Sequence, residues 1–413
     1  MKQSCVVFSC FLSLLLVGCE DLMELEKQSY VIAVGVDLTE KEGLFNFTFQ
    51  IANPESQAGS DTNGQLTDQT ITIPTSDLIT ATDIANNFVT KKINLDHVRV
   101  MIVSEKLARE NDFIRILQPS SRTTQMRRNI QIIVSGENAE AFLREASPAL
   151  ESKPHKYFQF MITRAHETGV IPDADFHRFF QVTEAEDGLF LGIYASTKNK
   201  GDDLSTPSIE KIAGELVTKG GNSAQFMGAA VFKNGKMIDI LNAQETRLAN
   251  ILNPSTDLDD VISGMPDPVD STYNIAGGFV QKTKPDINIQ YNAETNHATI
   301  DLVVPFEFEI VAIPSMIPYS EDDELKTLLK KSIEDYFNSI TEDLIVKTQE
   351  VYRAEPFNWS MFIRHYFKDI PSFEEANWSE SIYPNAEVTI DFRLQRLEFG
   401  KSLYDTNMKE MSD

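Results

Sequence analysis

Apolar and polar residues alternate along several segments of the chain, and this period of two is typical of β-strands with one buried face. The longest such segment spans residues 298–313, where apolar side chains alternate with Asp301, Glu307 and Glu309. Shorter β-rich segments are residues 30–37, 45–51, 98–102, 130–134, 189–194 and 388–394. These patterns predict sheets that bury one face and expose the other.

The apolar period changes to that of an α-helix between residues 321 and 351. One stripe of this segment carries Leu325, Leu328, Leu329, Ile333, Phe337, Ile340 and Leu344. At ~1.5 Å per residue the predicted helix is about 46 Å long. Shorter helical patterns alternate with the strands of the first half, which favours a sheet covered by helices. We therefore predict an α+β fold: a multi-domain, mixed α/β protein with helices packed on mixed and antiparallel sheets, and a long helix near the C-terminus.

Local turn signals connect these elements. Asn234-Gly235 separates two β-rich runs, and an Asn-Gly turn predicts a tight hairpin because both central residues need a positive φ. Asn242 and Glu245 have capping-box spacing at the start of a helix. In contrast, residues 53–74 are rich in Gly, Ser, Thr, Asp, Asn and Gln, the composition of a surface loop.

The 413-residue chain is too long for one hydrophobic core. Residues 198–207 mix charges with Gly, Ser and Pro and lack an apolar period, as expected at a domain boundary. We predict a signal peptide at residues 1–18, an N-terminal α/β region at 19–200 and a linker at 201–222. A C-terminal α/β domain at 223–400 and a tail at 401–413 would complete the chain.

The amino terminus has the build of a lipoprotein signal. Lys2 precedes an apolar run over residues 6–17, and the run ends in Leu-Val-Gly-Cys at residues 16–19. This ending resembles the bacterial lipobox, which implies that Cys19 carries a diacylglycerol and becomes the first residue. Two acyl chains are enough for stable anchoring. The alternative is an ordinary signal peptide with a chance cysteine.

Composition limits the partners. A formal charge of −25 disfavours nucleic acid, and it also predicts repulsion from anionic headgroups, so that the lipid anchors the chain without electrostatic help. Cys5 and Cys10 would leave with the signal peptide, and no thiol would then remain for a disulfide or a metal. No later segment has the length of a membrane-spanning helix, so we expect the mature chain on the outer face of the membrane.

The sequence predicts no enzyme, no cofactor and no metal site. Its six histidines lack the His-Glu-x-x-His spacing, and there is no Gly-x-Ser-x-Gly motif and no phosphate-binding loop. Asp257, Asp259 and Asp260 could bind a cation, but a solvated acidic loop is the better interpretation. His97 could contact a ligand, although a hydrogen-bonded histidine at a strand edge is the simpler reading.

An aromatic group near the C-terminus is the densest in the chain. Its members are Phe357, Trp359, Phe362, Tyr366, Phe367 and Trp378. Core packing is the first interpretation, and a partner-binding surface is the alternative.

In this order, these features resemble the Ger(x)C family, the C-subunit lipoproteins of bacterial spore germinant receptors. The resemblance covers nearly all of the mature chain. It is carried by Cys19 with its acidic spacer, by the Asn377-Trp378 pair, and by the segments VGVD (34–37), FTFQIANP (47–54), LDHVRVMIVSEKLA (95–108), RRNIQIIVSG (127–136), GAAVFKNGKMIDILNAQET (228–246) and TQEVYRAEPFNW (348–359). Glu20 stands where a tryptophan commonly follows the lipidated cysteine, which puts the membrane-proximal contact in question.

The resemblance implies a non-enzymatic, lipid-anchored subunit that assembles with two integral membrane subunits, A and B, in the spore inner membrane. A nutrient would be contacted only indirectly. An alternative is a lipoprotein that captures a small solute, which would need a deep apolar pocket with convergent polar groups. A third, a cell-wall hydrolase, would need two carboxylates at glycosidase separation.

Overall fold

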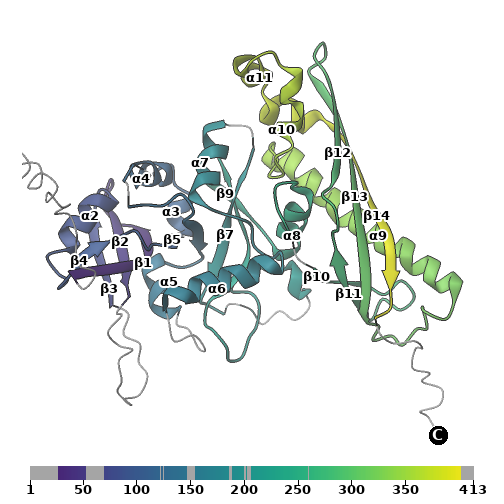
Figure 1. Cartoon of the computed structure of the whole chain (residues 1–413), viewed down its shortest axis with the longest axis horizontal. Helices are drawn as coiled ribbons and strands as arrows, with labels where there is room; N and C mark the ends of the chain where they lie inside the picture. Colours follow the sequence, from purple (N-terminus) through teal and green to yellow (C-terminus); the bar gives the residue numbers. More distant parts are fainter. Residues whose placement is uncertain are drawn as a thin grey trace, which may run out of the picture.

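The computed structural model describes residues 27–52, 69–120, 122–123, 125–146, 154–185, 188–199, 201, 206–258 and 260–400. Two sheets follow one another along the long axis of the molecule, from the purple amino-terminal end to the yellow carboxy-terminal elements (Figure 1). Helices pack on both sheets, so the predicted α+β architecture is confirmed. Cys19 and the predicted tail at 401–413 lie outside the described residues.

The first sheet is mixed. Its central strands β1, β5, β6 and β7 run parallel, and antiparallel strands extend it at both ends. In the described part of the chain the order is β3 (Gln69–Thr75), β2 (Phe45–Ile51), β1 (Gln28–Leu38), β5 (Val100–Ser104), β6 (Gln131–Ser135), β7 (Phe190–Ser196), β8 (Gln225–Lys233) and β9 (Lys236–Leu241), with β4 (Lys92–Asn94) parallel to β1. The parallel strands are buried on both faces, as their continuous apolar runs require.

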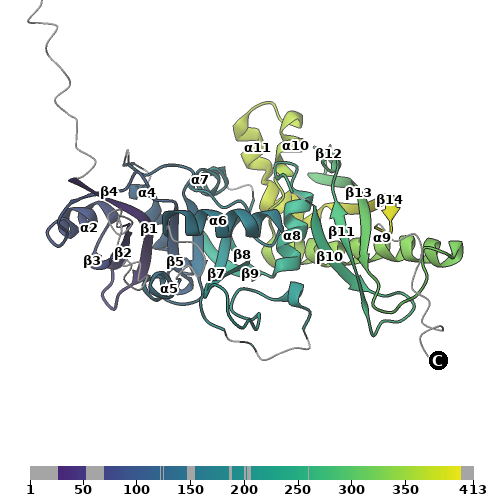
Figure 2. The same ribbon diagram turned by 60° about the horizontal axis from the view of Figure 1, so that its bottom comes forward.

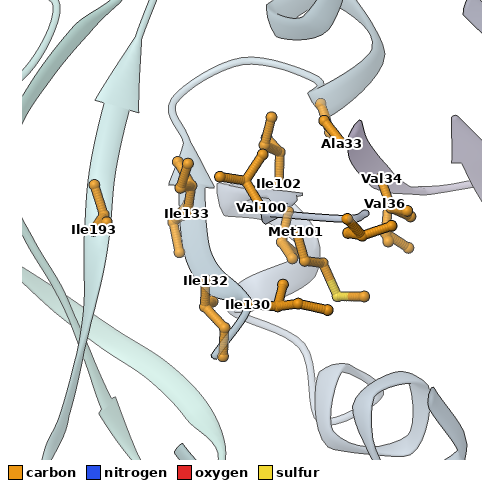
Figure 3. Packing of buried hydrophobic residues seen from close by; sticks show 14 of the residues in the cluster. Ala33, Val34, Val36, Val100, Met101, Ile102, Ile130, Ile132, Ile133 and Ile193 are labelled. Atoms are coloured by element: carbon orange, nitrogen blue, oxygen red, sulfur yellow. The ribbon is translucent and has the colours of Figure 1, made fainter. Parts of the chain in front are cut away.

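Helices cover the first sheet. They are α2 (Leu78–Ala85), α3 (Glu105–Ala108), α4 (Phe113–Ser120), α5 (Ala139–Glu145), α6 (Pro154–Glu167) and α7 (Phe176–Ala185). In Figure 1, α3, α4 and α7 lie on one side of the sheet and α5 and α6 on the other. Side chains of neighbouring strands, such as Val36, Ile102 and Ile133, pack together in the first core (Figure 3).

The predicted local signals are present. Asn234 (φ 51°) and Gly235 (φ 78°) form the turn between β8 and β9, which confirms the predicted hairpin. Asn242 and Glu245 form a reciprocal capping box at the start of α8 (Ala243–Leu252). The predicted β-rich segments 30–37 and 45–51 form the antiparallel β1–β2 pair.

The second sheet is built on β13 (His297–Ala312). The order is β10 (Val261–Pro266), β11 (Asn274–Val280), β13 and β12 (Asp286–Asn292), and β14 (Glu387–Glu398) runs parallel to β13. Every second residue of β13 from Ala298 to Ile310 is buried, as its alternation predicts. The sheet packs on α9 (Asp323–Val346), which continues as the π-helix Lys347–Tyr352 and confirms the predicted long helix.

Short elements complete the described part of the fold. They are α10 (Ser360–Ile363), α11 (Ile370–Ala376), the 3₁₀ turns Ser208–Glu210, Arg364–Tyr366 and Tyr383–Asn385, and the π-turn Trp378–Ile382. None of the helices among the described residues combines the length and the apolar character needed to cross a membrane.

Two features differ from the sequence interpretation or go beyond it. The loop predicted for residues 53–74 is wrong at its end, because Gln69–Thr75 pairs with β2 and becomes the edge strand β3. In addition, β7 and β8 contribute to both cores: Ile193 and Phe232 pack in the first, Leu191 and Val231 in the second. The division into 19–200, 201–222 and 223–400 stays a prediction. The strands on either side of the predicted linker, β7 and β8, contribute side chains to both cores.

Candidate functional site

Buried polar side chains join the two sheets at a junction whose centre is helix α8. This helix lies between the first sheet and α9 (Figures 1 and 2). From Thr246 to Leu252 every residue of α8 is buried. A short helix that is buried all round must satisfy its polar side chains inside the protein.

Arg247 joins the two sheets through its guanidinium group. Its Nε and Nη2 donate to the carbonyl oxygen of Thr168, after α6, at 3.1 and 2.8 Å. Its Nη1 donates to the carbonyl oxygen of Ile262 in β10 at 3.0 Å. Burial lowers the pKa of Arg247 to about 10, so the group remains charged at neutral pH. Arg247 is therefore a buried cation held by two carbonyl groups from opposite sides of the junction.

Two neighbours on α8 extend this contact. The side-chain amide of Asn250 donates to the carbonyl oxygens of Gly169 (3.2 Å) and Ile171 (2.9 Å). On the other side, Gln244 donates to the hydroxyl group of Tyr336 in α9 at 2.7 Å. Helix α8 is thus bonded to the α6–α7 loop and to α9 together.

Glu355 forms a second buried contact across the junction. Its carboxylate accepts from the backbone N–H groups of Phe357 and Ser360 (3.1 Å for Ser360) and from the indole N–H of Trp378 (3.3 Å). Its carbonyl oxygen accepts from the N–H of Leu189, directly before β7, at 2.9 Å. The loop that leads from α9 to α10 is therefore fixed against the first sheet.

The β8–β9 hairpin supplies a third contact. Lys233 forms an ion pair with Glu380 (2.6 Å) and donates to the carbonyl oxygen of Tyr352 (3.0 Å). The hydroxyl group of Tyr352 donates to the carboxylate of Asp239 at 2.6 Å. Burial raises the pKa of Tyr352, so this hydroxyl group stays protonated. The predicted Asn-Gly turn thus positions β8 and β9, which bind the C-terminal elements through Lys233 and Asp239.

In open α/β sheets, ligands often bind at the carboxyl ends of parallel strands. Here the acidic groups at that end bond to the chain itself. Asp37 accepts from the N–H groups of Ala139 (2.8 Å) and Glu140 (3.0 Å), and so caps α5. Glu137 accepts from the hydroxyl group of Ser196 (2.9 Å) and from the N–H of Thr197 (2.6 Å). Burial raises the pKa of Asp37 despite these hydrogen bonds.

Two of the hollows at the surface of the described residues bear on ligand binding. One, of about 340 Å³, lies between Ala185 at the end of α7 and Phe367, Ile370 and Phe373 near α11. It is open, and Ile370 is 72% exposed. The other, of about 410 Å³, has a lining that mixes polar and apolar side chains, among them Arg99 and Ile162. Neither has the deep, enclosed apolar form expected of a solute-binding lipoprotein.

The structure separates the candidate residues that the sequence suggests. His97 is exposed, with its ring edge-on to Tyr30 at 4.7 Å. Asp257 forms an ion pair with Lys284, and Asp259 lies outside the described residues. Among the residues that the structure describes, no three His, Cys, Asp or Glu side chains are grouped to hold a metal ion.

The predicted aromatic group divides in two. Phe357, Trp359 and Trp378 are buried in the second core, as the core-packing interpretation predicts. Tyr366 is 46% exposed, and its hydroxyl group donates to the carbonyl oxygen of Ile289 in β12 at 3.1 Å. The group thus forms core at one end and covers the edge of the second sheet at the other.

Sequence reasoning missed the junction residues Arg247, Asn250 and Glu355. A weak signal existed for the first two, because Arg247 and Asn250 lie three residues apart on one face of a helix that is otherwise largely apolar. Glu355 had no such signal, since its partners come from three separate segments.

The fold and the junction define a class of α+β protein. Strands β7 and β8 contribute to both hydrophobic cores, and buried polar contacts join the two sheets. The chain matches two family models, the "Spore germination protein N-terminal domain" over residues 21–194 and "Spore germination B3/ GerAC like, C-terminal" over residues 227–400. It therefore belongs to the Ger(x)C family of spore germination proteins, as its sequence motifs predict.

A solved structure supports the fold. The chain is similar to the crystal structure of the GerBC protein, with a TM-score of 0.52 and 15% sequence identity over 91% of this chain and 100% of that chain. At this identity the likeness shows the architecture alone. No curated protein matches the chain.

Proposed function

We propose that this chain is a non-enzymatic, lipid-anchored subunit of a nutrient germinant receptor, required for the receptor to assemble and signal during spore germination. The main support for this proposal is that both halves of the chain match family models of spore germination proteins. The junction supports a structural role, because Arg247 and Glu355 bond to segments on both sides of it. Such contacts suit a subunit in which the two sheets move together as one rigid body.

The proposed partners are the two integral membrane subunits, A and B, of the same receptor. The family resemblance supports them, together with a site on the outer face of the spore inner membrane. A diacylglycerol on Cys19 would hold the chain beside these subunits. The nutrient would act on this subunit only through them.

Capture of a small solute is the second candidate, and the hollow between α7 and α11, although open and not enclosed, is the place where we would look for it. Arg364 and Asp369 supply both charge signs at its rim. A solute binder should gain thermal stability with a nutrient that triggers germination, because a ligand of the native state alone stabilises it by mass action. A receptor subunit without a ligand site should show no shift.

The proposed function predicts the effect of removing the lipid. Anchoring in the same bilayer raises the effective concentration of partner subunits, so a weak interface suffices for assembly. A Cys19→Ala variant should therefore fold with unchanged circular dichroism but fail to support nutrient-triggered germination. Germination of spores that contain only this variant is the measurement.

Cys10→Ala is the matched control. It changes a cysteine within the predicted signal peptide and should leave germination normal, with a mature chain that begins at Cys19 and has the mass of the diacylglycerol form. Normal germination with Cys19→Ala, at equal protein level, would refute the anchored-subunit proposal. A free thiol on Cys19 in the mature protein would refute the lipid itself.

A further inference from the structure

Large apolar side chains are exposed at one end of the second sheet, around the β10–β11 turn and the loop that follows β13. They are Val269, Tyr273, Val311 and Met316, and their exposed fractions lie between 40% and 57%. We name these four residues the apolar tip. Single exposed apolar residues are normal on a protein surface, but a group of them with a polar rim is typical of an interaction site.

A buried carboxylate holds the two loops of the apolar tip together. Asp267, directly after β10, accepts hydrogen bonds from the N–H of Val269 (2.8 Å) and from the hydroxyl group of Ser315 (2.6 Å). Ser315 directly precedes Met316. The N–H of Asp267 donates to the carbonyl oxygen of Tyr273 at 3.0 Å. These segments are therefore held in place before a partner binds, which lowers the entropy cost of binding.

The backbone of Met316 is left-handed, with a φ of 58°. Glycine adopts this conformation freely, whereas it costs free energy for a residue with a long side chain. The N–H of Met316 donates to the carbonyl oxygen of Ile313 at 3.0 Å, which closes a turn shortly after Val311. Backbone strain of this kind gathers at ligand-binding sites, and methionine is an adaptable side chain at binding surfaces. These two features favour a binding role for Met316.

Acidic residues lie beside the apolar tip. Glu309 shares the exposed face of β13 with Val311, two residues further on. The loop that holds Met316 then runs into residues 321–324, which are all acidic and exposed. Carboxylates therefore flank the apolar tip both on the strand before its second loop and on the segment after it.

Two cations near this end already have partners within the chain. The ammonium group of Lys326 lies 5.9 Å from the centre of the ring of Phe399, and Arg396 forms an ion pair with Glu398. The apolar tip is thus a group of apolar side chains in a negative potential. A partner that fits it presents an apolar side chain flanked by lysines or arginines.

Charge disfavours two other occupants. A bilayer with anionic headgroups would be repelled by the carboxylates beside the apolar tip. The chain's own residues 401–413 follow β14, which ends on the same side of the second sheet as β13 (Figure 1). A Cβ atom at Gly400 would lie 3.5 Å from the carbonyl oxygen of Ile310, so this segment starts close to the apolar tip. Its two lysines are outnumbered by three acidic residues, however, so its charge does not complement that of the rim.

We propose that one of the two membrane subunits, A or B, docks on the apolar tip through a segment with an apolar side chain between basic residues. The apolar contact supplies most of the affinity, and the opposite charges orient the two proteins and speed their association. This inference rests on the proposed function, which names these partners but no surface for them.

The test is photo-crosslinking in the assembled receptor. The full chain is produced together with subunits A and B, with a photoreactive benzoylphenylalanine in place of Val269. Illumination should give an adduct with the mass of this chain plus one membrane subunit. The same label in place of Ile370, which is exposed on α11, should give none. Equal yields at the two positions would overturn the assignment to this surface.

Met316→Ala should lower the yield of the adduct by about tenfold, as expected when a central contact residue is truncated. Its thermal stability should match that of the wild type, because the side chain is exposed. Met361→Ala is the matched control, since it removes an exposed methionine from α10. This control should leave the yield unchanged.

A charge reversal tests the rim. Glu309→Lys/Asp323→Lys should also lower the yield, most strongly at low salt, because screening weakens surface charge interactions as salt rises. Glu374→Lys/Glu375→Lys makes the same change of charge on α11 and should have no effect. An equal loss of yield in both double variants would show that only the net charge of the chain matters, and the rim would have no part in docking.

The inference and the proposed function fail in different ways. If A and B co-purify with the chain but no adduct forms, or the adduct joins position 269 to residues 401–413 or to a second copy, the inference is wrong while the proposed function stands. The same holds if Met316→Ala leaves the yield unchanged. If A and B do not co-purify with the wild-type chain, the proposed function fails, and the inference with it.

Discussion

At the scale of single residues, Gly277 shows how little space the second core leaves. A Cβ atom at this position of β11 would lie 2.2 Å from Cε1 of Phe308, whose ring is buried under α9. No rotation of a methyl group relieves such a contact, so the ring or the strand would have to move. The glycine is therefore required by packing.

Gly277→Ala should lower the free energy of unfolding by about 1–3 kcal/mol, the usual cost of overpacking a core. Urea unfolding measures this loss. Gly278→Ala is the matched control, because a Cβ at the next residue finds its nearest atom, the carbonyl oxygen of Glu309, at 4.0 Å. Equal stability of the two variants would show that β11 and β13 are not packed as described.

Asp267 links the end of β10 to the loop before α9. It accepts hydrogen bonds from the hydroxyl groups of Ser315 (2.6 Å) and Tyr319 (2.5 Å) and from the N–H of Val269 (2.8 Å). Burial acts to raise the pKa of this carboxyl group, but the hydrogen bonds outweigh it and hold the pKa below its usual value of 3.8. The native state thus favours the ionised form.

This lowered pKa predicts how stability depends on pH. The unfolded chain binds a proton at Asp267 more readily than the native protein, so the contribution is complete above pH 3.8 and is lost as the pH falls through the native pKa. Asp267→Asn should be less stable than the wild type at pH 7, with a difference that shrinks toward pH ~2. Urea unfolding at both pH values tests this, and a constant difference would contradict it.

At the scale of elements, α9 protects the outer edge of β14. The N–H of Phe392 donates to the side-chain oxygen of Asn338, and the N–H of Leu394 donates to the carboxylate of Glu334, both at 2.8 Å. An edge strand with free N–H groups invites pairing with another chain. Two side chains one helical turn apart thus occupy the places that a further strand would take.

Glu334→Ala/Asn338→Ala should leave these two N–H groups without partners. We expect a loss of about 2 kcal/mol in stability, at roughly 1 kcal/mol per hydrogen bond, and faster aggregation on mild heating, measured by light scattering. Asp335→Ala/Ser339→Ala changes the exposed neighbours on the same helix and should behave like the wild type. Equal aggregation of both double variants would argue against edge protection.

Elements with local causes were predictable from the sequence. The Asn234-Gly235 turn, the Asn242–Glu245 capping box, the alternation of β13 and the stripe of α9 each depend on residues close in sequence. In contrast, β3 was missed although its Thr-Ile-Thr-Ile run alternates with a period of two, because the polar residues before it extended the predicted loop too far. The junction escaped prediction for a different reason, since Arg247 is bonded by carbonyl groups that the sequence does not place.

At the scale of the whole molecule, strands β7 and β8 contribute side chains to both cores, so the two cores should unfold together. Both tryptophans of the chain, Trp359 and Trp378, lie in the second core. Their fluorescence therefore reports on that core, whereas far-ultraviolet circular dichroism reports on all elements. We expect both signals to give one urea midpoint, the mark of a two-state transition. Separate midpoints would show that the cores unfold independently.

The parallel pairing of β14 with β13 also has a consequence for the order of folding. A chain emerges from the ribosome amino end first, and β13 is complete long before residues 387–398 follow. Until then, one side of the longest strand has no partner. A chain that ends before β14 would leave this side of β13 unpaired and exposed to chaperones and proteases, so β14 closes the open side of the second sheet.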